Sequence, residues 1–271
     1  MKDTPAAEST LRGKMNSRIC RLTGLAAALI LSMTGAQAVD GVTFSGGISG
    51  ATFGVIDLQP DDGVTASYSA SLRNSSYYGR LDGRSLDQEF SDETSGQQPV
   101  THTLSAGDLN ATLTAGDGIG EISIHGAISP YREADALVEI RAVQTYDVTL
   151  SAGSALTLSG HAFLDLGYSG NGIGNRLTNA STTIYMFSRN DNGPVTRTSL
   201  GTREVGYSHA EDFWLAFANP GTEDSVVTVQ FLTDSFTIVE ALPVPEPATY
   251  AMLGLGLLTL GAAARRRASR A

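Results

Sequence analysis

Apolar and polar residues alternate along most of the middle of the chain, between residues 39 and 242. Over residues 137–150, nearly every second residue is apolar, and the intervening positions hold polar side chains such as Glu139 and Arg141. A period of two residues predicts a half-buried β-strand. The run over 156–168 repeats the pattern after a short Ser-Ala-Gly-Ser turn, so we predict that the two runs form a long antiparallel hairpin.

Further runs with the same alternation, separated by turns rich in Gly, Pro and Asp, predict further strands. These runs cover residues 51–58, 64–72, 109–115, 119–125, 213–219, 226–232 and 236–242. A short helix over residues 135–142 is the weaker alternative for that segment. The pattern predicts an all-β body of two antiparallel sheets, packed as a jelly-roll or immunoglobulin-like sandwich.

The polar stretches at 82–99 and 167–179 predict long loops within this body. We predict one domain over residues 39–242. The alternative is two smaller sandwiches that divide near residue 130.

Residues 1–38 have the features of a secretory signal. A basic stretch over 14–21 precedes an apolar stretch over 22–33, which predicts a signal helix, and Ala36 and Ala38 provide the small side chains that signal peptidase accepts. Cleavage after Ala38 would make Val39 the first mature residue. The residues before Met15 lack the basic character of a signal, which favours Met15 as the true start.

Residues 243–271 contain three elements in order. The first is Val244, Pro245, Glu246 and Pro247; the second is an uncharged run over 248–264; the third is Arg265, Arg266 and Arg267. As a helix, the uncharged run would be about 25 Å long, near the roughly 30 Å of a hydrocarbon core. We therefore predict a transmembrane helix in which the arginines stop transfer on the cytoplasmic side.

This tail resembles the PEP-CTERM sorting signal of Gram-negative bacteria, on the Pro-Glu-Pro, the apolar helix and the arginine cluster. The resemblance implies recognition by an exosortase, a membrane cysteine transpeptidase that cleaves near Pro-Glu-Pro. It also implies delivery to the cell surface or the extracellular space, often together with exopolysaccharide and biofilm matrix. Residues 55–64 look like a segment of some PEP-CTERM proteins without a known activity.

The charge of the chain is concentrated in the body. Between residues 39 and 247 there are nine Arg, no Lys and 26 Asp plus Glu, a net charge of −17. Nucleic-acid binding needs a basic face, so nucleic acid is not expected as a partner. We expect no cofactor, although such a surface attracts divalent cations and weak calcium binding follows from it. The only Cys, Cys20, lies in the signal, so the mature protein has no disulfide and no thiolate nucleophile.

The residues with catalytic potential form no recognisable motif. The four histidines are far apart in sequence, no serine lies in a Gly-x-Ser-x-Gly turn, and no metal site is expected. Four acidic pairs, at 61–62, 92–93, 211–212 and 223–224, are predicted to be solvated turn residues. Trp214 lies in a run that alternates like a core strand, so we predict a core position, with an exposed ligand platform as the alternative.

Together these observations predict a non-catalytic exported protein of the cell surface or extracellular matrix, associated with exopolysaccharide or biofilm. Its expected partners are signal peptidase, an exosortase-type sorting enzyme, the membrane through the C-terminal helix, and an extracellular polysaccharide. A carbohydrate-binding module of the same sandwich class is the alternative, and a secreted glycan-active enzyme is the weakest of the three.

Overall fold

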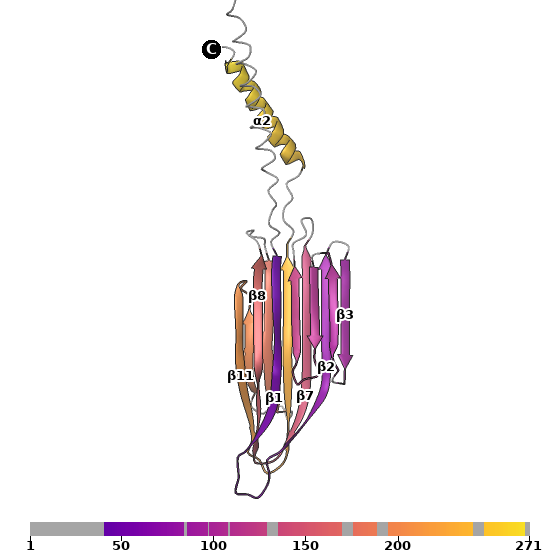
Figure 1. Cartoon of the computed structure of the whole chain (residues 1–271), viewed down its shortest axis with the longest axis vertical. Helices are drawn as coiled ribbons and strands as arrows, with labels where there is room; N and C mark the ends of the chain where they lie inside the picture. The colour runs from indigo at the N-terminus through magenta and orange to yellow at the C-terminus, as the bar shows by residue number, and fades with distance from the viewer. Residues whose placement is uncertain are drawn as a thin grey trace, which may run out of the picture. The chain divides into compact units, whose positions relative to one another are not determined.

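The computed structural model describes residues 41–83, 86–96, 98–107, 109–128, 135–169, 176–188, 195–240 and 247–268. Residues 41–239 of this part form long antiparallel strands in two six-stranded sheets (Figure 1). Sheet A contains, in spatial order, β11 (Tyr207–Asn219), β8 (Ser154–Ser169), β1 (Gly41–Asp57), β6 (Ile122–Ile128), β5 (Leu109–Ala115) and β4 (Val100–Ala106). Sheet B contains β10 (Val195–Thr202), β9 (Arg176–Ser188), β12 (Ser225–Val239), β7 (Ala136–Leu150), β2 (Tyr68–Gly83) and β3 (Leu86–Thr94).

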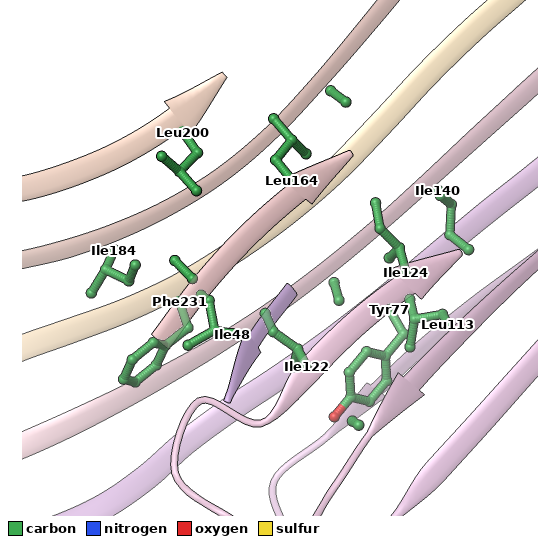
Figure 2. Close-up of a cluster of buried hydrophobic side chains, with 14 of the residues drawn as sticks. Ile48, Tyr77, Leu113, Ile122, Ile124, Ile140, Leu164, Ile184, Leu200 and Phe231 are labelled. Carbon is green, nitrogen blue, oxygen red and sulfur yellow. The ribbon is translucent and has the colours of Figure 1, made fainter. Parts of the chain in front are cut away.

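The two sheets pack face to face around a hydrophobic core to which both contribute. Figure 2 shows part of this core, to which Ile48, Ile122 and Leu164 of sheet A and Phe231 and Ile184 of sheet B belong. In β7 the residues buried against the core are those that the alternation predicts. The predicted antiparallel β-sandwich is therefore confirmed. Its two six-stranded sheets match neither the roughly seven to nine strands of an immunoglobulin domain nor the about eight of a jelly roll.

The predicted hairpin over 137–150 and 156–168 is wrong. Both runs are strands, but β7 pairs with β12 and β2 in sheet B, whereas β8 pairs with β1 and β11 in sheet A. The turn between them crosses from one sheet to the other. Alternation shows which face of a strand is buried, but it is compatible with any antiparallel partner. The predicted strands at 109–115 and 119–125 do pair with each other, as β5 and β6.

The structure also differs from the two predicted loops and from the alternative helix. The stretch 82–99 contains β3 and the end of β2. The stretch 167–179 contains the end of β8 and the start of β9, and its residues 170–175 lie outside the described residues. The segment 135–142 belongs to β7 and is not helical. Both sheets combine strands from before and after residue 130, so a division there would separate hydrogen-bonded strands.

The first and last strands of the body are central in their sheets and meet the rest of the chain at the same end. β1 begins where β6 ends, since Val42 pairs with Ile128, and β12 ends where β7 begins, since Val239 pairs with Ala136. The chain passes directly from β6 to β7, so these strand ends lie together (Figure 1). The segments that precede and follow the body are therefore attached to the same end of the two sheets.

At the opposite end, three turns are tied to one another by hydrogen bonds. The side-chain amide of Asn219 donates to the carbonyl oxygens of Ser151 at 3.1 Å and Glu223 at 2.9 Å. The backbone N–H of Leu58 donates to the carbonyl of Gly153 at 2.9 Å, and that of Gly153 to the carbonyl of Gly221 at 3.1 Å. These bonds join turns from three parts of the sequence and satisfy backbone groups that would otherwise be unpaired.

Side chains close the two sides of the sandwich where sheet edges meet. The amide of Gln88 in β3 donates to the carbonyl of Ser105 in β4 and accepts from its N–H, both at 3.2 Å. On the other side, the hydroxyl of Thr196 in β10 lies 3.4 Å from the carbonyl oxygen of Ala216 in β11. Bonds of this kind occupy edge groups that could otherwise pair with a strand of another molecule.

Tyr146 places a phenol in the core. Its side chain is 2% exposed, and its ring meets those of Phe53 and Phe231 edge-on, with centroids 6.1 and 5.9 Å away. Burial raises the pKa of Tyr146 to about 12, with a further increase from Tyr77 and an opposing effect from a hydrogen bond of the Gly120 backbone. Burial has this effect because it disfavours the charged phenolate.

We expect Tyr146 to make the fold sensitive to alkaline pH. Its unfolded pKa is about 10 and its folded pKa about 12, so the unfolded state loses its proton first and gains stability as pH rises between these values. The free energy of unfolding should fall by about 2 kcal/mol between pH 9 and pH 11.5. Urea unfolding at pH 9 and pH 11.5 measures the effect. Tyr146→Phe has no ionisable group at this position, so its free energy of unfolding should fall less between the two pH values, by about the amount attributed to Tyr146. Equal decreases in both proteins would contradict the prediction.

Candidate functional site

The C-terminal segment that contains the Pro-Glu-Pro sequence follows the central strand β12 after a short connection. The helix α2 (Pro247–Ala268) begins at Pro247, the last residue of the Val-Pro-Glu-Pro sequence, and contains Arg265, Arg266 and Arg267 near its end. Proline is favoured at the first helical position because it needs no N–H partner there, and cations are favoured at a helix C-terminus. Val244, Pro245 and Glu246 lie outside the described residues, as do Ala36 and Ala38 of the predicted signal.

One expectation about this helix needs correction. Among the residues that the structure describes, no helix is both long and apolar enough to cross a membrane. The helix that the sequence predicts is present and contains 22 residues.

Comparison with protein families decides what this segment is. Residues 243–267 match the family model of the PEP-CTERM protein-sorting motif. The chain carries a PEP-CTERM motif. The matched residues include the Pro-Glu-Pro, the whole uncharged run and the three arginines, so the resemblance seen in the sequence is confirmed. No curated protein and no solved structure matches the chain.

The PEP-CTERM motif determines the destination of the protein in broad terms. It implies processing by an exosortase-type sorting enzyme, export, and a location at the cell surface or outside the cell. The motif lies wholly beyond Val239, where β12 ends. Cleavage near Pro-Glu-Pro would therefore leave every strand of both sheets intact.

On the body, the outer face of sheet B has two adjoining shallow hollows. The larger, of about 480 Å³, is lined by polar and aromatic side chains of β2, β7 and β12, among them Tyr78, Glu139, Arg141 and Gln230. The smaller, of about 270 Å³, shares Glu139 and Arg141 and adds Asp234. Burial, then the carboxylates of Glu139 and Glu89, raise the pKa of Tyr78, which keeps this phenol neutral and able to donate a hydrogen bond.

Of the four acidic pairs, two contribute a carboxylate that accepts a hydrogen bond in a turn, and the other two lie on strands. The carboxylate of Asp62 accepts from the N–H of Val64 at 2.7 Å, and that of Asp224 from the N–H of Ala152 at 3.3 Å, as expected for turn residues. The pairs at 92–93 and 211–212 lie in β3 and β11, so their assignment to turns was wrong. Both are edge strands, and edge strands tolerate charge on either face.

The histidines do not come together. His102 stacks on Phe90 with centroids 4.4 Å apart, His209 lies 3.5 Å from Glu211, and Nδ1 of His161 lies 2.8 Å from Oδ1 of Asp212. Within the described part of the chain, no group of three or more His, Asp and Glu residues could hold a metal ion. Each described histidine therefore acts alone or beside one carboxylate.

Trp214 is a feature that the sequence reasoning placed wrongly. Its neighbours Phe213 and Leu215 are buried in the core, but Trp214 points outward from β11 and is 63% exposed. The strand does alternate like a core strand, but the tryptophan shares its parity with Asp212, which is exposed, and not with the phenylalanines. That shared parity was the signal that could have identified it.

Proposed function

We propose that this protein is a non-catalytic component of the cell surface or extracellular matrix that is processed by an exosortase-type enzyme. The PEP-CTERM motif at residues 243–267 is the observation that carries the proposal. Signal peptidase would act at the other end of the chain, after Ala38. The mature product would be the sandwich, an acidic body that needs no cofactor and associates with exopolysaccharide or biofilm.

The topology of the body supports this proposal. Both processing segments join the body at one end, where β1 begins and β12 ends. The turns at the opposite end and the outer faces of both sheets remain unchanged by processing. A matrix component needs such a body, because its interactions must survive the removal of both segments.

Cell fractionation of the host, with and without its sorting enzyme, tests the proposal. With the enzyme present, we expect a product in the envelope or medium whose C-terminal peptide lacks Arg265, Arg266 and Arg267 by mass spectrometry. Without the enzyme, the uncleaved precursor should accumulate. A native product that keeps its full arginine tail, or one found dissolved in the cytosol, would overturn the proposal.

Carbohydrate binding by the sandwich is the second candidate function. The exposure of Trp214 favours it, because an aromatic ring with one solvated face is a platform on which a sugar ring can stack. A pull-down of the protein on the host's exopolysaccharide distinguishes the two candidates. Saturable retention is expected only of a binding module.

A further inference from the structure

The outer face of sheet A is rich in hydroxyl groups, and its described strands carry no Lys or Arg, whereas the arginines at 73, 80, 141, 176 and 197 all lie on strands of sheet B. By register, many of its outward positions are Ser or Thr: Thr43, Ser45, Ser49, Thr52, Thr101, Thr103, Ser105, Thr112, Thr114, Ser123, Thr157 and Ser159. Such a face offers donors and acceptors of hydrogen bonds in a regular array.

Trp214 lies at one side of this face beside a group of polar side chains. Across the strands it pairs with Ser159, which in turn pairs with Thr52, and the hydroxyls of these two residues are 3.2 Å apart. The next row contains Asp212 and His161, joined at 2.8 Å. With strands about 4.8 Å apart, the row of three residues covers about 10 Å. We call these five residues the Trp214 surface.

We propose that the Trp214 surface binds an uncharged polysaccharide, with the indole of Trp214 stacked against one sugar ring. The inference rests on the second candidate function and assigns it to one face of sheet A. A pyranose has an apolar face of C–H groups and a rim of hydroxyls. The indole matches the first, while Ser159, Thr52 and the carboxylate of Asp212, whose side chain is 90% exposed, match the second.

The charge of the surface selects against anionic polymers. Asp212 and Asp165 are the acidic side chains on the outward positions of β11 and β8, and no Arg or Lys of these strands neutralises them. A uronic-acid polymer would meet repulsion from these carboxylates and no Lys or Arg. The two hollows lined by Arg141 lie on the other sheet, so the Trp214 surface is suited to a neutral chain lying across strands.

A protein partner matches the surface less well than a glycan. On the described strands of sheet A, Ile56 and Trp214 are the exposed large hydrophobic residues, and they lie on different strands. The buried centre of a protein interface is more apolar than this. A chain of sugars needs only one stacking platform and neighbouring hydrogen-bonding groups.

Trp214 provides its own spectroscopic test, because it is the only Trp of the chain. Its fluorescence in the full-length protein reports directly on the proposed platform. Titration with dextran, soluble β-glucan, galactomannan and xyloglucan should give, for at least one of them, a saturable blue shift as water leaves the indole. Alginate and hyaluronan, which are anionic, should give none. A panel without any saturable response to a neutral polymer would overturn the inference.

Affinity electrophoresis of variants in the responding polymer separates this site from other ways of binding glycans. Trp214→Ala should weaken binding about 10- to 30-fold, as expected for an aromatic anchor that the bound ligand covers. Trp214→Phe should retain part of the affinity. Tyr78→Ala, in the hollow of sheet B, is the matched control and should bind like the wild type. Circular dichroism should show all variants folded, since Trp214 lies outside the core.

Two results would count against the site in different ways. If Tyr78→Ala loses binding and Trp214→Ala keeps it, carbohydrate binding stands but belongs to sheet B, and the inference is overturned. If ultracentrifugation shows a wild-type dimer that Trp214→Ala makes monomeric, the surface is an interface between copies, which also overturns it.

Discussion

Replacing Pro245 and Glu246 together by alanine should slow maturation at least 10-fold. Glu246 is the only charged residue between positions 241 and 264, so it is the one ionic group that a sorting enzyme can recognise there. A lost hydrogen bond to a charged group costs about 1.5–3 kcal/mol, which is roughly a 10- to 100-fold loss in processing rate. The loss of Pro245 adds to this, because proline keeps the segment extended and accessible to an enzyme cleft. C-terminal mass spectrometry of pulse-labelled protein measures the processed fraction.

Glu240→Ala is the matched control for this experiment. It removes the same charge from an exposed residue just before the matched motif, so its processing should equal that of the wild type. The double variant should melt like the wild type, because its changes lie beyond β12. A double variant that loses its arginine tail at the normal rate would show that Pro-Glu-Pro is not the recognised feature.

The sequence predicted the faces of the strands better than their partners. Alternation in β7 separates buried Ile140 and Val148 from exposed Arg141, and the structure agrees. The neighbours of β7 are β2 and β12, which are far from it in sequence. Such pairings depend on how the whole sandwich assembles, and a short turn between two strands does not show whether it stays within one sheet.

Edge strands were the other source of error. In β3 the side chain of Phe90 packs inward, with its ring against Gly79 of β2. Gln88 has the same parity, but it bonds to β4 at the edge of the sandwich. A strand with a neighbour on only one side needs few apolar residues, so its composition resembles that of a loop. The PEP-CTERM motif could be predicted from the sequence, because its elements are contiguous and do not depend on how strands pair.

Phe231→Ala should cause the largest loss of stability in the body. Phe231 is fully buried in β12, meets Tyr146 edge-on with centroids 5.9 Å apart, and lies over Gly120, where a Cβ would come within 2.6 Å of its ring. Truncation of a buried Phe costs about 3–5 kcal/mol because it leaves a cavity. For a body of this size, the melting temperature should fall by roughly 10–15 °C. Thermal unfolding followed by circular dichroism measures the change.

Phe236→Ala makes this experiment a test of register as well as of packing. Phe236 lies on the same strand with the opposite parity, at the outer face of sheet B, where it lines the smaller hollow. Its truncation should cost about 1 kcal/mol or less, because little of the core is lost. A shift of β12 by one residue would exchange the two phenylalanines between core and solvent. Equal losses, or a larger loss for Phe236→Ala, would therefore contradict the pairing of β12 with β7 and β9 on which the arrangement of sheet B depends.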